Sequence, residues 1–296
     1  MTMSQNKKIS VIIPNFNYAH FLDEAIESVL RQTYQNIELI IVNNGSTDDS
    51  LIVLEKYRGR VHVIDQQNLG QSGARNSGLK YASGELIAFL DADDFWVPNK
   101  LELQIQSINE VTQLVYCGIS QFKNLENQAR RTIHPKFKGN CVDYFIDLPG
   151  ASIVLSGEST ALFTRELLNK TGNFDMELNS TAGWDFFRRC SIFTEFDFVD
   201  EPLTHYRIHS SNMSSSHQKV IEDMRRAYSK MFSDSNMEIN PQRQVKTKIK
   251  LEWSFLKTYL RIRKLKLVAS SGLNLLKMAP SLFDSVLKFS GSGKPR

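Results

Sequence analysis

Short apolar runs alternate with longer mixed stretches through the first 120 residues of the chain. The apolar runs have the length of buried strands and occupy residues 9–16, 37–42, 61–66, 85–90 and 114–120. The stretches between them are predicted to be helices and occupy residues 19–33, 48–57, 72–82 and 98–110. This alternation predicts βαβ units, and therefore an α/β fold with a mostly parallel sheet flanked by helices.

Polar residues follow each of these predicted strands directly. In an open parallel sheet the carboxyl ends of the strands lie at one edge, and ligands bind there. Four segments are therefore expected to meet at that edge: residues 14–17, 43–47, 67–70 and 91–94.

The last of these segments is acidic, because Asp91, Asp93 and Asp94 follow the apolar run Ile87–Leu90 without a break. In extended backbone, residues two apart share a face, so the carboxylates of Asp91 and Asp93 are expected to lie together. Carboxylates in this arrangement suit Mg²⁺ or Mn²⁺, which also bind phosphate oxygens. A solvated turn that caps the next helix would explain the same residues, and this motif alone leaves both explanations open.

The motifs PNFN, VNNGSTDDS, NLGQSGARNSG and FLDADD occur in this order on successive strand ends. Together they resemble the family 2 inverting glycosyltransferases, over about residues 8–212. The resemblance implies a GT-A fold, which is a Rossmann-like sheet, and a nucleotide diphosphate sugar as donor. It also implies a catalytic domain in residues 1–215, with a nucleotide-binding half in 1–120 and an acceptor-binding half in 121–215.

Carried over by position, the resemblance implies that the segment after the first strand lies under the nucleobase of the donor. Phe16 is expected to stack on the base, although packing in the core would also explain an aromatic residue there. The residues of this floor are Pro14, Asn15, Phe16 and Asn17. The family usually has a carboxylate for the uracil ring in the next motif, whereas this chain has Asn43 and Asn44, and Asn44 is the predicted contact.

The resemblance also assigns residues to the diphosphate and the metal. Arg75 is expected near the donor phosphates, unless it forms only a surface salt bridge. Asp93 is expected to be the principal metal ligand, and Asp91 to contact the ribose or the metal. Arg207 is expected at the phosphates and His209 at the metal or diphosphate, although a single histidine is often structural.

Inverting transfer needs a carboxylate that accepts the proton of the acceptor hydroxyl. In the family this base belongs to an acidic pair, which is Ala182-Gly183 in this chain, so the nearest carboxylate, Asp185, is the predicted base. Asp185 could instead only pair with Arg188 or Arg189. The base would then be one of three other carboxylates, or the protein would be inactive; they are Glu158, Asp175 and Glu177.

Charge is unevenly distributed along the 296 residues, since residues 243–296 carry a net +11 although the whole chain carries only +4. The acidic remainder argues against a nucleic-acid partner. Residues 216–296 are predicted to form a helical tail, basic and amphipathic, that binds an anionic membrane surface. Its basic stripe comprises Lys246, Lys250, Lys257, Arg261 and Lys264, and a second apolar segment is APSLFDSVLKF. A helical arm packed on the domain is the alternative.

The remaining features concern location and activity. The amino terminus lacks a signal-peptide pattern, no apolar stretch reaches the ~18 residues that span a bilayer, and three scattered cysteines show no metal spacing. We expect a cytoplasmic protein, free or peripheral on the cytoplasmic face of the membrane. Its expected activity moves a sugar, UDP-linked by preference, to a glycan or lipid-linked hydroxyl in surface polysaccharide synthesis. A non-catalytic scaffold and a nucleotidyltransferase are the alternatives.

Overall fold

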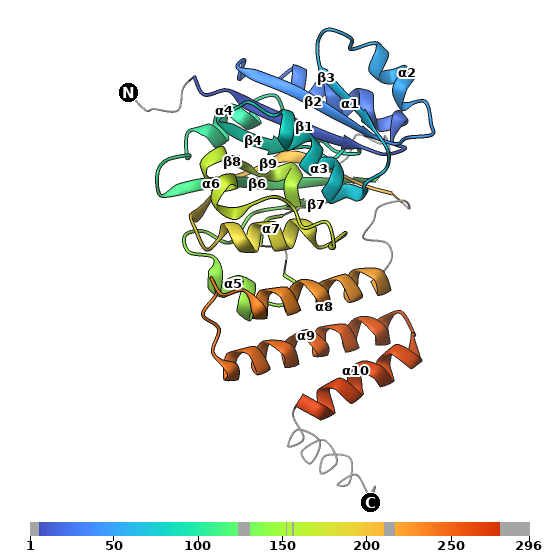
Figure 1. Cartoon of the computed structure of the whole chain (residues 1–296), viewed down its shortest axis with the longest axis vertical. Helices are drawn as coiled ribbons and strands as arrows, with labels where there is room; N and C mark the ends of the chain where they lie inside the picture. Colours follow the sequence, from blue (N-terminus) through green and yellow to red (C-terminus); the bar gives the residue numbers. More distant parts are fainter. Residues whose placement is uncertain (1–5, 124–130, 152, 156, 210–216, 279–296) are drawn as a thin grey trace, which may run out of the picture. The chain divides into compact units, whose positions relative to one another are not determined.

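The computed structural model describes residues 6–123, 131–151, 153–155, 157–209 and 217–278 (Figure 1). The described residues divide into two compact units. One unit is drawn from residues 1–143 and 152–216, and the other from residues 144–151 and 217–296.

The first unit is built on one mixed sheet, to which nine strands contribute within the described residues. Its parallel part has the spatial order β3-β2-β1-β4. These strands are β1 (Ile9–Asn15), β2 (Ile37–Asn44), β3 (His62–Gln66) and β4 (Leu86–Phe89). The predicted α/β fold is confirmed. The strands are parallel in the part of the chain where apolar runs alternate with predicted helices.

The rest of the sheet mixes directions. Strand β8 pairs antiparallel with β4 and with β6, whereas β9 pairs parallel with β6 and antiparallel with β5. The strands of this part are β5 (Phe95–Trp96), β6 (Thr112–Lys123), β7 (Arg131–Ile133), β8 (Leu162–Thr164) and β9 (Glu195–Ile208). Because β9 pairs with β5, the end of this long strand returns to the residues that follow β4.

Helices cover one face of the parallel strands in a continuous apolar core. Alternate residues of β1, among them Val11 and Ile13, point into this core because successive side chains of a strand face opposite sides. Leu22 and Ile26 meet them from α1, four residues apart on one helical face. The helices of this face are α1 (Ala19–Leu30), α2 (Ser50–Glu55) and α4 (Lys100–Ile105).

The opposite face is covered by α3 (Gly70–Tyr81), whose backbone approaches β1 closely. A Cβ added to Gly78 would lie 2.4 Å from Cγ2 of Ile12, so only glycine permits this approach. Further along the sheet, Phe163 of β8 and Phe174 pack against Phe186 of α7 (Ala182–Cys190). Two short elements lie near these, namely the 3₁₀ helix η1 (Gly157–Thr160) and α6 (Arg165–Thr171).

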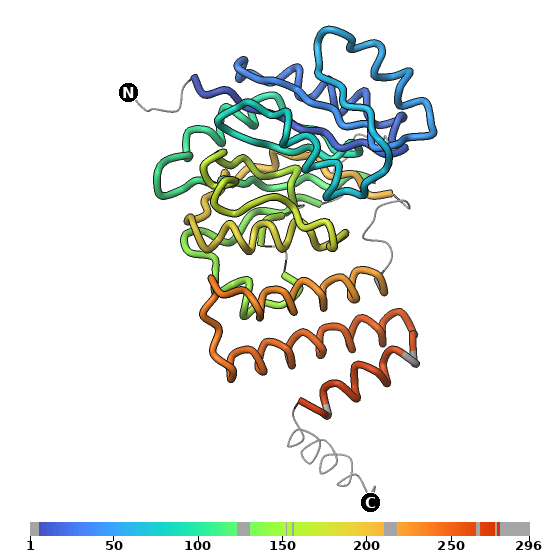
Figure 2. The backbone as a smooth tube through the Cα atoms, viewed as in Figure 1, coloured from blue at the N-terminus to red at the C-terminus, as the bar shows by residue number. Residues whose placement is uncertain are grey.

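The second unit is helical. It contains α8 (His217–Ser233), α9 (Pro241–Arg261) and α10 (Leu265–Met278), together with residues 144–151. The carboxyl-terminal part of α5 (Val142–Asp147), drawn in green, lies beside the orange helix α8 in Figure 2. The hydroxyl of Tyr228 on α8 donates to the carbonyl of Phe145 on α5 over 3.2 Å. None of the described helices is long and apolar enough to cross a membrane.

Helix α9 presents two different faces. Its buried face repeats every four residues and comprises Thr247, Leu251, Phe255 and Tyr259. Glu252 is also buried, and both of its carboxylate oxygens accept hydrogen bonds of 2.8 Å from Arg225. The apolar and aromatic side chains of this part of the predicted amphipathic tail are therefore divided, since Phe255 and Tyr259 are buried whereas Trp253 and Leu260 are about half exposed. The segment APSLFDSVLKF lies outside the described residues.

Candidate active site

Three aspartates gather at the carboxyl end of β4. The chain turns there, because the N–H of Asp94 donates to the carbonyl of Asp91 over 3.0 Å. One carboxylate oxygen from each of Asp91, Asp93 and Asp94 lies within 4.8 Å of the others. The predicted pair of acids is therefore a cluster of three, and Asp94 is a member that the spacing argument left out.

The electrostatics of this cluster are unfavourable without a cation. Burial raises the pKa of Asp93, and the charge of Asp91 raises it further. Burial and the same neighbouring carboxylates raise the pKa of Asp94 well above its ordinary range. Three carboxylates of this kind fit the oxygen-ligand chemistry of Mg²⁺ or Mn²⁺, because a doubly positive ion offsets both the repulsion and the loss of solvation.

Residues at and just after the end of β9 contact this acidic turn. Nε2 of His209 lies 2.9 Å from Oδ2 of Asp93, and the backbone N–H of Arg207 donates to Asp94 over 3.1 Å. The Arg207 side chain donates to the carbonyl of Asp93 over 3.0 Å and to the carboxylate of Glu24. His209 therefore contacts Asp93, the predicted metal ligand, and Arg207 holds the acidic turn in place. The contact of His209 with a metal or diphosphate, and that of Arg207 with phosphate, stay predictions. No sequence motif pointed to Glu24.

Arg75 is the central cation of the site. Its side chain is only 2% exposed, so it is not a surface salt bridge. One guanidinium nitrogen lies 3.0 Å from Oδ1 of Asp91 and the other lies 2.6 Å from Oε1 of Glu158. Because α3 starts at the carboxyl edge of the sheet, Arg75 reaches the end of β4 from one turn inside this helix. Its reach to a donor phosphate stays a prediction.

Amide side chains line the carboxyl ends of β1 and β2. Asn15 donates to Asn43 over 3.4 Å, and Asn43 donates to the carboxylate of Asp65 on β3 over 2.7 Å. The carbonyl oxygen of Asn44 accepts from Gln66 and from a backbone N–H, and its NH₂ group donates twice. Asn44 therefore stabilises the β3–α3 turn, and its contact with a nucleobase stays a prediction. Asp65 was not predicted, although it is the last residue but one of β3, near the same edge.

The loop after β1 is tied to the loop after β2. Asn17 has a φ of 59°, a left-handed conformation that asparagine tolerates. Its side-chain oxygen Oδ1 accepts from the backbone N–H of Thr47 over 2.7 Å, and its backbone N–H donates to the hydroxyl of Ser46 over 3.0 Å. Phe16, between Asn15 and Asn17, is 44% exposed. The ring therefore does not pack in the core, which leaves it accessible for stacking, and Pro14 sits half-buried one residue before Asn15.

The predicted base, Asp185, lies in the first turn of α7 with a side chain only 3% exposed. Oδ1 lies 3.0 Å from a guanidinium nitrogen of Arg188, and Oδ2 accepts from Arg189 over 2.8 Å. Both pairings that the sequence raised as an alternative role are thus present. Glu158, in contrast, belongs to the cluster around Arg75.

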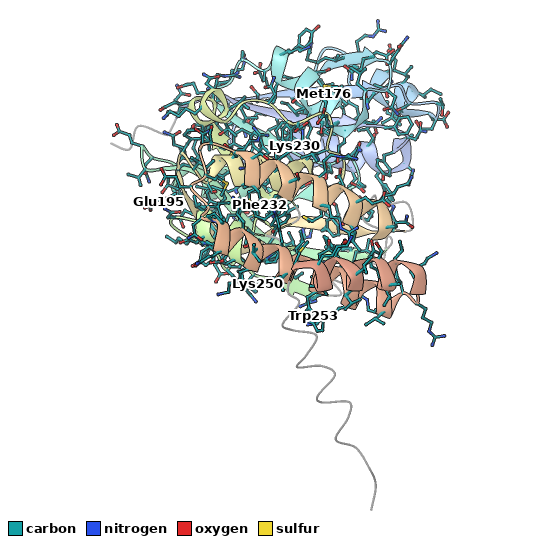
Figure 3. All side chains as sticks on the ribbon, turned by 60° about the horizontal axis from the view of Figure 1, so that its bottom comes forward. Met176, Glu195, Lys230, Phe232, Lys250 and Trp253 are labelled. Atoms are coloured by element: carbon teal, nitrogen blue, oxygen red, sulfur yellow. The ribbon has the colours of Figure 1, made fainter. Side chains whose placement is uncertain are left out.

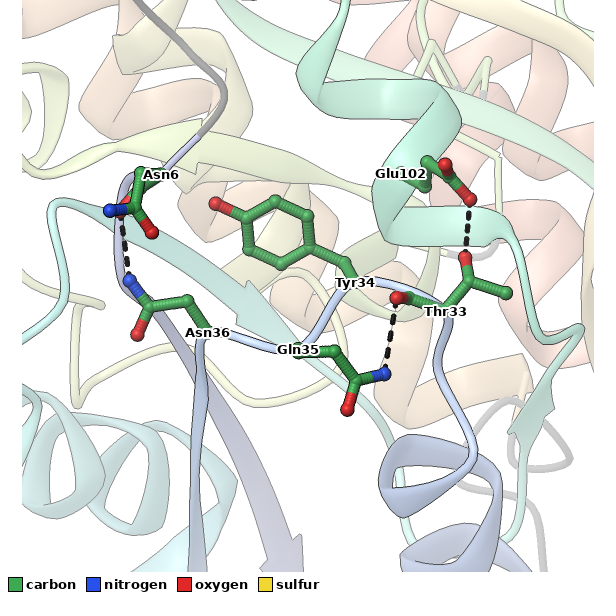
Figure 4. Close-up of a pocket in the computed structure, with 6 residues that line it drawn as sticks. All are labelled: Asn6, Thr33, Tyr34, Gln35, Asn36 and Glu102. Atoms are coloured by element: carbon green, nitrogen blue, oxygen red, sulfur yellow. Dashed lines mark hydrogen bonds between the residues drawn. The ribbon is translucent and has the colours of Figure 1, made fainter.

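A hollow of about 350 Å³ lies away from this site (Figure 4). Residues 33–36, directly before the amino end of β2, form most of its lining, together with Asn6 and with Glu102 of α4. The hollow is therefore at the opposite edge of the sheet from the aspartates. Thr33 donates to Glu102 over 2.5 Å across it, and Asn36 donates to the carbonyl of Asn6 over 2.8 Å. Polar side chains of its lining thus form hydrogen bonds with other groups of the lining, either side chains or backbone carbonyls. We assign this hollow no role in the chemistry.

Comparison with known sequences decides the family. The sequence model of glycosyl transferase family 2 matches residues 10–172, more than half of the chain. The chain belongs to this family. An uncharacterized glycosyltransferase of Nostoc sp. is 35% identical over 216 residues, which are 69% of this chain and 66% of that protein. The segment thus spans about two thirds of that relative.

A second relative of the family 2 chain has a named reaction. It is the Escherichia coli enzyme WfgD, named as a UDP-Glc:alpha-D-GlcNAc-diphosphoundecaprenol beta-1,3-glucosyltransferase. It is 46% identical over 99 residues, which are 33% of this chain and 39% of the enzyme.

Solved structures confirm the GT-A fold. Staphylococcus aureus TarS 1-349 in complex with UDP-GlcNAc superposes with a TM-score of 0.62 and 21% identity, over 86% of this chain and 73% of TarS. The mannosyltransferase PcManGT of Pyrobaculum calidifontis, in complex with GDP-Man and Mn²⁺, gives a TM-score of 0.63 and 15% identity, over 93% of this chain and 82% of PcManGT. The resemblance implied by the four motifs is therefore confirmed.

Proposed function

We propose that this family 2 chain is an inverting glycosyltransferase that takes a sugar from a UDP-linked donor and places it on a hydroxyl of a glycan or lipid-linked acceptor, in the synthesis of a surface polysaccharide. The observation that carries the proposal is the buried cluster of Asp91, Asp93 and Asp94 with Arg75 and His209 at the carboxyl edge of the sheet. This is the edge at which open α/β sheets bind ligands.

The residues of the site divide the work of transfer. The exposed ring of Phe16 offers a surface for the nucleobase, next to the amide side chains of Asn15 and Asn43. Arg75 supplies positive charge, and Arg75 and His209 both offer hydrogen-bond donors, on the side where the diphosphate would depart. The three aspartates would hold a Mg²⁺ or Mn²⁺ ion, and such an ion neutralises negative charge on a leaving diphosphate.

The donor and acceptor classes rest on the relatives. WfgD takes glucose from UDP-glucose to a sugar on a diphosphoundecaprenol, TarS is solved with UDP-GlcNAc, and PcManGT with GDP-mannose and Mn²⁺. These names support the proposal that this chain uses a nucleotide sugar as donor, a lipid-linked sugar as acceptor and a divalent cation such as Mn²⁺.

We also propose that α9 attaches the protein to an anionic membrane surface, where lipid-linked acceptors are found. One stripe of α9 repeats at spacings of three and four residues and combines exposed lysines with exposed apolar side chains; it comprises Lys246, Lys250, Trp253, Lys257 and Leu260. Lys250 and Trp253 project from this helix in Figure 3. Basic residues interleaved with tryptophan and leucine suit the headgroup region of an anionic bilayer.

The direct test is a release assay on the purified protein. UDP-glucose, UDP-N-acetylglucosamine and GDP-mannose are each incubated with Mn²⁺ and a GlcNAc-diphosphate-lipid acceptor, and nucleoside diphosphate and pyrophosphate are measured. We expect nucleoside diphosphate together with a glycosylated lipid of inverted anomeric configuration. Release of pyrophosphate would indicate a nucleotidyltransferase, and donor binding without turnover would indicate a scaffold.

A further inference from the structure

The reaction proposed above needs a carboxylate with a free lone pair beside the acceptor hydroxyl. Asp185 is poorly suited, because each of its oxygens already faces an arginine of its own helix. Among the alternatives, Asp175 accepts the N–H of Glu177 over 2.9 Å, and Glu177 is exposed on a loop. The remaining alternative, Glu158, is the carboxylate that contacts Arg75 in the candidate active site.

The position of Glu158 is tied to a missing side chain. Gly183 is the second residue of α7, where the family resemblance implies an acid, and a Cβ built on it would lie 2.5 Å from Oε1, 2.7 Å from Cδ and 2.8 Å from Oε2 of Glu158. The whole carboxylate of Glu158 therefore occupies the space into which a side chain at 183 would project. A residue from η1 thus brings an acid to the place that the sequence pattern left without one.

The surroundings of Glu158 are those of the reaction centre. Its Oε1 lies 2.6 Å from a guanidinium nitrogen of Arg75, and the same guanidinium contacts Asp91 of the aspartate cluster. The next residue, Ser159, accepts the backbone N–H of Asp91 over 3.1 Å, so η1 is held directly to the end of β4. Burial raises the pKa of Glu158, and Arg75 works against this by favouring the carboxylate form.

We propose that Glu158, and not Asp185, is the catalytic base of this chain, in compensation for Gly183. The inference rests on the proposed function. In the step, a lone pair of Glu158 takes the proton of the acceptor hydroxyl while that oxygen forms a bond to the anomeric carbon. The bond from this carbon to the diphosphate breaks, and its electron pair leaves with the nucleoside diphosphate. Glu158 ends the step protonated.

Two single variants separate a base from a structural counterion of Arg75. Glu158→Gln keeps the volume and removes the charge, whereas Glu158→Asp keeps the charge and withdraws the carboxylate by one methylene. We expect both to lower kcat for UDP release with Mn²⁺ and acceptor by at least about 100-fold, with the KM for the nucleotide sugar changed less than about threefold. A counterion role would leave Glu158→Asp near wild-type kcat and would raise the donor KM in Glu158→Gln.

A double variant moves the acid back to the helix. Gly183→Asp alone is expected to unfold or lose activity, because its Cβ meets Glu158. In Glu158→Ala/Gly183→Asp the clash is gone and a carboxylate returns to the same space, so we expect at least about tenfold more turnover than in Glu158→Ala. This comparison also decides the matter if Glu158→Gln fails to fold. Glu166→Gln, an exposed glutamate on α6 paired with Lys170, is the matched control.

The outcomes distinguish the two proposals. Turnover by wild type together with near-normal kcat in folded Glu158→Gln overturns the assignment of the base and leaves the proposed function intact. A folded double variant no more active than Glu158→Ala also overturns it. Wild-type protein that releases no nucleoside diphosphate from any of the three donors overturns both proposals.

Discussion

Arg189 donates its Nε–H to Oδ2 of Asp185 over 2.8 Å, one turn further along the same helix. The guanidinium also donates to the carbonyls of Thr171 and Asn173, so it ties α7 to the end of α6. This carboxylate therefore acts as the centre of a buried ion-pair network in α7. These ion pairs explain the presence of an aspartate at position 185 without a catalytic role for it.

Asp185→Asn is expected to destabilise the fold more than it impairs the chemistry. The substitution removes the negative charge that both Arg188 and Arg189 contact, and breaking a buried ion pair in this way costs about 3–5 kcal/mol of unfolding free energy. Urea denaturation of both proteins measures this loss. A wild-type free energy of unfolding, combined with abolished turnover and intact donor binding, would instead make Asp185 the base.

Asp94→Asn should separate metal binding from folding. In the metal-free protein the variant should be at least as stable as wild type, because it removes one of three mutually repelling carboxylates while its oxygen can still accept the N–H of Arg207. With Mn²⁺ the rise in melting temperature that we expect for wild type should be smaller in the variant, since one ligand is lost. Thermal unfolding in EDTA and in Mn²⁺ checks both signs. An equal Mn²⁺ response in both proteins would exclude Asp94 as a ligand.

Glu38 should make the fold sensitive to acid. Burial by itself would raise the pKa of Glu38, but hydrogen bonds from Lys8, Ser10 and Ser83 outweigh it and lower the pKa from 4.5 to about 2. A carboxyl group whose pKa is lower in the folded state stabilises the fold above its unfolded pKa, and this stabilisation is lost as pH falls from about 4.5 to about 2.

The corresponding variant is Glu38→Gln. At pH 7 it should unfold more easily than wild type, by about 1–2 kcal/mol after allowing for solvent screening of a partly exposed group. The difference should narrow steadily below pH 4. Denaturant titrations at pH 7, 4 and 3 measure the trend, and a difference that stays constant with pH would show that the charge of Glu38 is not responsible.

Reversing charge on the exposed stripe of α9 should detach the protein from anionic vesicles. Lys246→Glu/Lys257→Glu is expected to weaken sedimentation with phosphatidylglycerol vesicles at least about 30-fold, at about 1 kcal/mol for each basic residue near the surface. Lys56→Glu/Lys80→Glu carries the same change of net charge on exposed positions of the other unit and serves as control. Equal losses in the two double variants would mean that net charge, and not this stripe, attracts the vesicles.

The site was predictable to the extent that it follows from single strands. Asp91 and Asp93 could be placed because a carboxylate directly after a buried run is expected at the strand end, whereas the role of Phe16 followed from the family resemblance. The side-chain contacts of these residues could not be derived from the strand pattern, and His209 was expected near them only through the family resemblance. Asp93 meets His209 across 116 positions of sequence, and Arg207 reaches Glu24 across 183, which are pairings that no local periodicity encodes.

By itself, the sequence determined the α/β class, the parallel strands and the edge that carries the chemistry, because side-chain period and strand-end polarity are local properties of the chain. Tertiary structure alone decided which carboxylates face one another. Glu158 lies against Gly183 and Arg75, and Asp185 turns to its neighbouring arginines, because η1, α3 and α7 pack at one place on the sheet. The balance of burial, charge and available volume at that place exists only once the chain is folded.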